Sequence, residues 1–197
     1  MTETFTERLR MRSNAVFAFA LLTILLAARP VHSSAEVPIN REYQIKAAYL
    51  VKFLNFVEGV RTVGDASTIC VIGGNVFGGT LTKLVAASTR AVDVRAQKTA
   101  DGIDECSVVF VHGRDASLTE SVLRAARGSP ILTVSDTEGF ASKGGIIELI
   151  VEGSRVRFII NHAAAREDGL RISSKLLALA SELVRSNESS SSDSDSE

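Results

Sequence analysis

The sequence predicts a three-layer α/β/α sandwich built on a mostly parallel sheet. Strand-like and helix-like segments alternate from residue 68 to residue 134, which is typical of parallel strands joined by crossover helices. Near-continuous apolar runs, VVFV at 108–111 and IIELIV at 146–151, indicate strands that are covered on both faces. A last pair of strand patterns, 145–151 and 155–160, is separated by three residues and predicts an antiparallel hairpin.

Residues 1–35 have the features of an export signal. An arginine-rich start at 8–12 precedes an apolar run at 15–28, and small residues at 33–35 suit a signal peptidase. We therefore expect this segment to be cleaved and the protein to reach the periplasm. An uncleaved membrane anchor is the alternative, but the run is shorter than the about 20 residues that a membrane span needs.

The rest of the chain has the size and composition of one folded domain, expected over residues 36–186. Hydrophobic residues make up 45% of the sequence, which is ample for a core. Loss of the signal peptide leaves 18 basic and 21 acidic residues of the original 22 and 23, a net charge of −3. This balance argues against a nucleic-acid partner. Residues 187–197, NESSSSDSDSE, carry no apolar side chain and predict a disordered tail.

The first element expected after the signal is a helix at 41–57. Its apolar residues recur every three or four positions, which predicts one face turned toward the core. The alternative is that Tyr49, Phe53 and Phe56 are exposed and form a partner interface, because aromatic side chains are favoured contacts. Lys46 lies beside this stripe and is expected to extend to solvent.

The middle of the chain follows the alternating pattern. Ser117 is a plausible N-cap of one helix because Glu120 follows three residues later, the arrangement of a capping box. The expected strands are 68–73, 91–97, 107–112 and 130–134, the expected helices are 80–88 and 117–127, and a single helical turn is expected at 138–142.

The C-terminal stretch predicts a strand followed by two helices. Asn161 is placed to cap the first helix, at 162–166, and Gly169 to end it in a left-handed conformation. The second helix is expected to begin near Ser173. Its predicted apolar face consists of Ile172, Leu176, Leu179, Ala180 and Leu183.

The predicted export of the protein decides how its two cysteines are interpreted. Cys70 lies in the predicted strand TICVIG, and Cys106 just precedes the strand SVVFV. In an oxidising compartment such a pair favours a disulfide, expected to be structural. A redox switch and two buried free thiols are the alternatives.

Three segments resemble the YfiR/HmsC-like family of periplasmic proteins. They are RFIINHAAAREDGLRISSKLLALA at 157–180, KAAYLVKFLNFVEGV at 46–60 and ILTVSDTEGFASKGGIIELI at 131–150. The resemblance implies a non-enzymatic repressor that binds the periplasmic sensor region of an inner-membrane diguanylate cyclase. It would thereby control cyclic diguanylate signalling and biofilm formation. It also implies an outer-membrane OmpA-like lipoprotein as a possible second partner and a possible homodimer; a sensor kinase could replace the cyclase.

Sequence motifs for catalysis or cofactors are weak. The glycine-rich turn at 73–79 follows a strand, as nucleotide-binding loops do, but it lacks both the G-x-G-x-x-G and the P-loop patterns. A triad would require His112 or His162 beside a serine and a carboxylate, and no G-x-S-x-G is present. The histidines and acids show no metal-ligand spacing. We expect neither an enzyme nor a cofactor.

Two clusters remain candidates for a ligand or partner surface. His112, Ser135 and Asp136 fall at strand ends, where open α/β sheets bind ligands; turn formation is the other interpretation of Ser135 and Asp136. Near the last helix, Arg171, Ser173 and Ser174 could bind an anion, or serve capping and solvation alone. A periplasmic small-ligand-binding protein that uses the first cluster is the alternative function, and an enzyme of unrecognised type is a third hypothesis.

Overall fold

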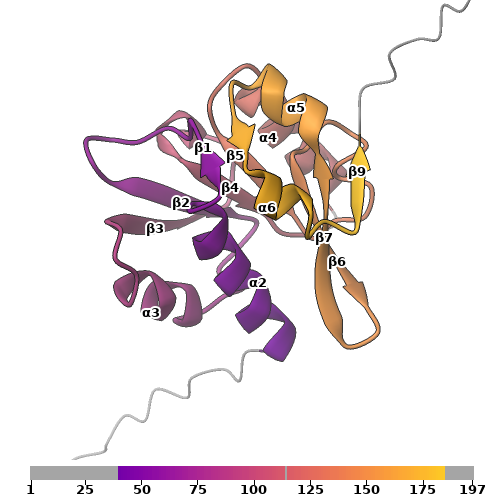
Figure 1. Cartoon of the computed structure of the whole chain (residues 1–197). Helices are drawn as coiled ribbons and strands as arrows, with labels where there is room; N and C mark the ends of the chain where they lie inside the picture. The colour runs from indigo at the N-terminus through magenta and orange to yellow at the C-terminus, as the bar shows by residue number, and fades with distance from the viewer. Residues whose placement is uncertain (1–39, 114, 185–197) are drawn as a thin grey trace, which may run out of the picture. The chain divides into compact units, whose positions relative to one another are not determined.

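The computed structural model describes residues 40–113 and 115–184. A seven-stranded sheet runs through it in the order β3-β2-β4-β5-β6-β7-β9 (Figure 1). The strands β3, β2, β4, β5 and β6 are parallel to one another. The strands β6 and β7 form the antiparallel hairpin, and β9 is parallel to β7. The predicted fold class is confirmed. The strands are β2 (Ser67–Ile72), β3 (Val92–Gln97), β4 (Val108–Val111), β5 (Leu132–Ser135), β6 (Ile147–Glu152), β7 (Arg155–Asn161) and β9 (Glu182–Val184).

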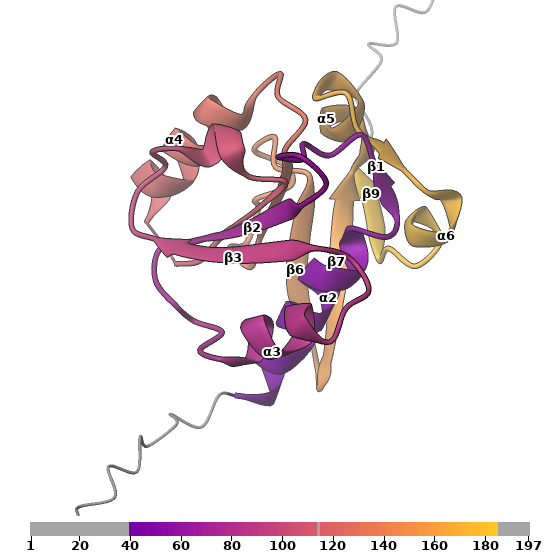
Figure 2. The same ribbon diagram turned by 90° about the vertical axis from the view of Figure 1, so that its left-hand side faces the viewer.

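Helices cover both faces of this sheet (Figure 2). Because side chains alternate along a strand, Val108 and Phe110 pack into one apolar cluster while Val109 and Val111 pack into another on the opposite face. The first cluster receives side chains from α2 (Arg41–Phe53) and α3 (Thr80–Ala86), and the second from α4 (Ala116–Ala126) and the 3₁₀ turn η1 (Ile103–Glu105).

The helix α2 is shorter than predicted. Asn40 caps it by accepting from the Glu42 amide at 3.2 Å, and it ends at Phe53. The chain then turns, so that β1 (Val57–Glu58) pairs antiparallel with β8 (Arg171–Ile172) in a small second sheet. Pairing with a distant segment thus ends the helix where the local periodicity would have continued it.

Asp115, not Ser117, caps α4. Its carboxylate accepts from the Ser117 amide at 2.9 Å and the Leu118 amide at 3.2 Å. The prediction was wrong by two positions because both residues are good caps and the helix starts after the earlier one. Residues 138–144 form consecutive turns and not the predicted single helical turn.

The C-terminal stretch agrees with the prediction in its first half only. Asn161 caps α5 (His162–Glu167) through the Ala164 amide at 2.9 Å, and Gly169 has φ +75°. The second helix, α6, is limited to Ser174–Leu177. Leu179 is 67% exposed, and Leu183 belongs to β9, so the predicted long apolar face is wrong. The chain leaves the helix because Ser181 donates to the Phe158 carbonyl and β9 joins β7.

Cys70 and Cys106 form a disulfide, as predicted. They lie 36 residues apart with their Cα atoms 6.0 Å from each other. Both are fully buried in the cluster beneath α4, where the bridge joins β2 to the residue that ends the turn η1. The predicted signal peptide and the predicted tail lie outside the described residues. Within 40–113 and 115–184, no helix combines the length and apolar character needed to cross a bilayer.

Candidate functional site

Four polar side chains meet at the carboxyl ends of β4 and β5. His112 follows β4, Asp136 follows β5, and Tyr43 and Lys46 come from α2. Asp136 accepts from the Lys46 ammonium at 2.8 Å and from the Tyr43 hydroxyl at 3.1 Å, and its other oxygen lies 3.3 Å from His112 Nδ1. We call these four residues the carboxyl-edge cluster. It contains the predicted residues His112 and Asp136. It also contains Tyr43 and Lys46, which could not be predicted from the strand ends because they lie in α2.

Burial strengthens the interactions between the charged groups of this cluster. Lys46 is only 3% exposed, so the prediction that it extends to solvent is wrong. Its charge is balanced by Asp136 and by Glu42, which also forms an ion pair with it. Burial first, and the negative charge and hydrogen bond of Asp136 next, raise the pKa of the Tyr43 hydroxyl well above its ordinary value. The arrangement holds the first turns of α2 against the sheet.

The cluster occupies the crevice where an open α/β sheet would bind a ligand. Strand order reverses between β2 and β4, because β3 lies on one side of β2 and β4 on the other. The Tyr43 ring contacts the His112 ring, with centroids 5.6 Å apart, and the Phe77 ring in the glycine-rich loop, at 5.9 Å. The protein's own helix therefore fills this crevice.

Gly73 shows what the glycine-rich loop does here. It has φ +93°, and a Cβ at this position would lie 2.2 Å from the His112 carbonyl oxygen. The glycine thus permits the ends of β2 and β4 to approach closely. Ser135 is also structural: it is fully buried, donates to the Val111 carbonyl at 2.8 Å and accepts from the Thr137 amide at 3.0 Å.

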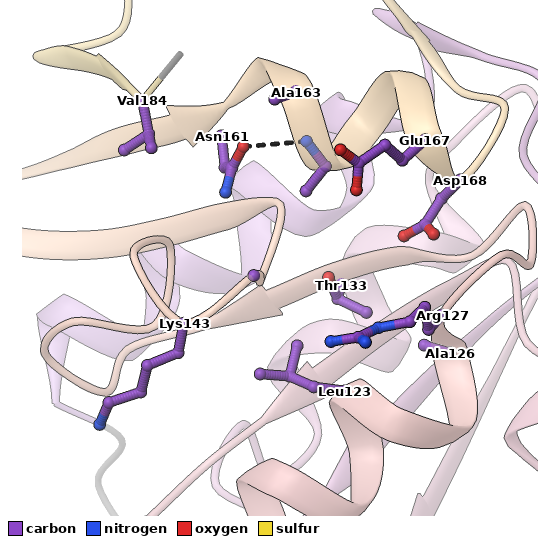
Figure 3. A pocket seen from close by; sticks show the side chains of 12 residues that line it. Leu123, Ala126, Arg127, Thr133, Lys143, Asn161, Ala163, Glu167, Asp168 and Val184 are labelled. Atoms are coloured by element: carbon purple, nitrogen blue, oxygen red, sulfur yellow. Dashed lines mark hydrogen bonds between the residues drawn. The ribbon is translucent and has the colours of Figure 1, made fainter. Parts of the chain in front are cut away.

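A separate, open groove lies along α4, on the other face of the sheet. Its first part is a cavity of about 380 Å³ between α4, α5 and the turn at 143–144 (Figure 3). The lining residues are Leu123, Ala126, Arg127, Thr133, Lys143, Gly144, Asn161, Ala163, Ala164, Glu167, Asp168 and Val184.

A second cavity, of about 650 Å³, continues the first. The two share Leu123, Arg127 and Lys143, and together we call them the α4 groove. Neither part is lined by His112 or Ser135, the residues from which a ligand crevice was predicted. The other residues that line the second cavity are Ala116, Thr119, Glu120, Arg124, Thr137 and Phe140.

The wall that carries Lys143 is rigidly supported. Glu148 is buried and accepts from the Gly139 amide at 2.9 Å and the Ala141 amide at 3.0 Å. The Asn161 side-chain amide donates to the Ala141 carbonyl at 2.8 Å. These bonds anchor the turns at 138–144 to β6 and β7, so this wall of the groove is preformed.

The opposite end of the groove carries acidic residues. Asp168 accepts from the Gly128 amide at 2.7 Å. Burial raises the pKa of the Asp168 carboxyl, partly offset by that amide. Glu167 is exposed beside it. The groove is therefore acidic next to α5, where the charge of Arg127, the residue that ends α4, acts on Asp168, and it is basic around Arg124 and Lys143.

Among the remaining predicted site residues, Phe53 packs in the core and Ser173 caps a helix. Phe53 is fully buried, which rules out the predicted contact through its ring, because it lies against the Tyr49 and Phe158 rings. Tyr49 and Phe56 are half-buried. Ser173 caps α6 through the Leu176 amide at 3.3 Å, and Ser174 is exposed. Arg171, in β8, pairs with Glu58 at 3.1 Å.

Comparison with known families identifies the relatives of this fold. The family described as YfiR/HmsC-like matches residues 43–181, which is nearly all of the described chain. The chain belongs to this family. YfiR/HmsC-like membership indicates a periplasmic regulatory protein. Among the described residues, no group of three or more His, Cys, Asp or Glu side chains could hold a metal ion.

One solved structure supports the fold of this YfiR/HmsC-like domain. A conserved domain protein from Vibrio cholerae matches with a TM-score of 0.51 at 13% identity over 72% of this chain. A second structure, the ABC domain from Streptococcus pneumonia in complex with L-Trp, has a TM-score of 0.49 at 14% identity over 72% of this chain. The chain spans 60% of the length of each of these two proteins. At these identities the first likeness bears on the fold alone.

Proposed function

We propose that this protein restrains an inner-membrane diguanylate cyclase by binding the periplasmic sensor region of that enzyme. Release of the restraint would raise cyclic diguanylate and promote biofilm formation. The observation that carries the proposal is the family match over residues 43–181, which includes α4, α5 and the strands β2 to β7.

The chemistry of the carboxyl-edge cluster supports binding in preference to catalysis. A general acid or base needs an atom that can reach a substrate. Here the oxygens of Asp136 are already engaged by Lys46, Tyr43 and His112. Its role in this account is to keep α2 in place and so to maintain the surface that a partner recognises.

The partners in this proposal are the cyclase and, in its place, a membrane sensor kinase that is regulated in the same way. An outer-membrane OmpA-like lipoprotein would sequester the repressor, and the protein would act as a homodimer. The half-buried Tyr49 and Phe56 are the surface aromatic residues proposed to contribute to a partner contact.

Cellular cyclic diguanylate tests the function directly. Deletion of the gene should raise the nucleotide and increase biofilm mass, and expression of the wild-type chain in the deletion strain should reverse both. An unchanged cyclic diguanylate level in the deletion strain would contradict the proposal.

Recovery of the partner tests the mechanism. The full chain, carrying an affinity tag, is captured from detergent-solubilised membranes, and the bound proteins are identified by mass spectrometry. We expect a membrane protein with a cyclase or kinase output domain that is missing from untagged cells. Folded protein that recovers no such membrane protein would count against the mechanism.

The α4 groove favours a second function, the binding of a small ligand. Its two cavities, of about 380 and 650 Å³, fall in the range of small-molecule sites, roughly 300–1,000 Å³. A thermal-shift screen of metabolites tests this function. Stabilisation by one chemical class, lost when Leu123 is replaced by Trp to fill the groove, would support it, whereas no shift with any compound would reject it.

A further inference from the structure

The described chain ends beside the α4 groove. Val184, the last residue of β9, lines the cavity between α4 and α5 (Figure 3). The sequence continues from this point for 13 residues, RSNESSSSDSDSE at 185–197. An extended chain of that length reaches about 45 Å, enough to follow the groove past both cavities.

The charges of this segment are ordered as the groove requires. Arg185 comes first in the sequence, directly after Val184, which lines the same cavity as Glu167 and Asp168. The acidic residues follow, and one cation against four acids gives the segment a net side-chain charge of −3. These acids are Glu188, Asp193, Asp195 and Glu197.

The basic end of the groove is available for such a segment. The second cavity is lined by three cations and one acid: Arg124, Arg127 and Lys143, and Glu120. All three cations are exposed. Within 40–113 and 115–184, the side chains of Arg124 and Lys143 form no hydrogen bond or ion pair, whereas the charge of Arg127 acts on the Asp168 carboxyl. By contrast, exposed Arg95, Arg157 and Arg171 each have an acidic partner.

We propose that the acidic C-terminal segment, residues 185–197, docks along the α4 groove of its own chain and competes with other acidic ligands for it. The attachment at Val184 supplies a high effective concentration, so a weak contact suffices. Exposed ion pairs are individually weak and are screened by salt, so the docked segment exchanges rapidly. No folding of the segment is required, in keeping with its lack of apolar residues.

Paramagnetic relaxation in the full chain tests this docking. Cys70 and Cys106 are bridged, so Ser194→Cys introduces a single reactive thiol for a spin label and keeps every acid in place. We expect strong loss of amide signal at Leu123, Arg127 and Lys143. The loss should disappear in about 1 M salt, where the screening length is about 3 Å.

Two matched variants decide whether the groove cations are responsible. Arg124→Glu, Arg127→Glu and Lys143→Glu together should abolish the signal loss. Lys52→Glu, Lys98→Glu and Lys175→Glu make the same charge change at exposed positions that line neither cavity, and should preserve it.

Three outcomes would overturn the proposal. One is the absence of broadening in the groove. Another is broadening that survives the groove substitutions while the fold is intact. The third is broadening that occurs only between labelled and unlabelled molecules in a mixture, which would identify a second copy as the source of the segment.

Discussion

The carboxyl-edge cluster and the α4 groove are two polar regions with opposite character. In the cluster, Lys46 and Asp136 are buried and paired. In the groove, Arg124 and Lys143 are exposed, and the described part of the chain supplies no acidic partner for them. The first region is closed by the protein's own helix, and the second is open.

This difference teaches that the position of a site cannot be assumed from the fold class. In open α/β sheets the crevice at the switch point usually binds the ligand. Here α2 fills that crevice, and the α4 groove lies on the opposite face of the sheet. The following substitutions test the contrast in order of decreasing effect on the free energy of unfolding.

Asp136→Ala should have the largest effect. It leaves the buried Lys46 ammonium with Glu42 as its remaining carboxylate, and loss of one partner of a buried ion pair costs about 3–5 kcal/mol. Urea denaturation measures the loss. The double variant Lys46→Met, Asp136→Leu should recover most of it, because it removes both charges. A loss below about 1 kcal/mol in Asp136→Ala, the range of an exposed pair, would show that the cluster is solvated and not closed.

Gly73→Ala should destabilise more than Gly74→Ala. Both glycines have positive φ, +93° and +121°, so both substitutions strain the backbone. Only at Gly73 would the new Cβ also meet a backbone atom, the His112 oxygen at 2.2 Å. We expect this overlap to add about 1–3 kcal/mol. Equal losses in the two variants, measured by chemical denaturation, would mean that the ends of β2 and β4 can separate freely.

Tyr43→Phe should cost about 1–2 kcal/mol near neutral pH, because Asp136 loses a partly buried donor. The raised pKa of Tyr43 also predicts a pH dependence. Its ordinary value is 10.0, so the folded state keeps a proton that the unfolded state loses above that pH, and stability should fall as the pH rises beyond about 10. Stability curves from pH 8 to 11 should show a smaller decline for Tyr43→Phe, and parallel declines would contradict the assignment.

Arg124→Ala and Lys143→Ala should have the smallest effect, within about 0.5 kcal/mol, because exposed and unpaired side chains contribute little to folding. Thermal and urea denaturation provide the measurement. A loss comparable to that of Asp136→Ala would show that these cations have a structural partner and that the groove is not open.

Much of the fold could be predicted from local patterns. Asn161 was identified as a cap because it stands between a strand pattern and a helix pattern, and it caps α5 in the structure. Gly169 was recognised in the same way, from its place after a short helix. The predicted cap Ser117 was wrong, because Asp115, two residues earlier, offers the same local signal and caps α4 in the structure.

The candidate sites were predicted less completely. His112 and Asp136 were found because parallel strands end at one edge of a sheet, but their contacts with Tyr43 and Lys46 were not. Arg124, in the last turn of α4, and Arg127, which ends that helix, could have suggested a basic region at the C-terminal end of α4. Nothing in the sequence indicates that Lys143, on a separate turn, lies across from it.

By itself the sequence determined the α/β class, most strands and helices, and the disulfide. Periodicity, capping residues and the features of an export signal can all be recognised within short segments of sequence. The tertiary structure alone decided that α6 stops at Leu177, that Lys46 is buried against a residue 90 positions away, and that a groove opens beside α4. Each of these features depends on contacts with a segment that is distant in the sequence. Short-range patterns do not indicate which distant segments come into contact.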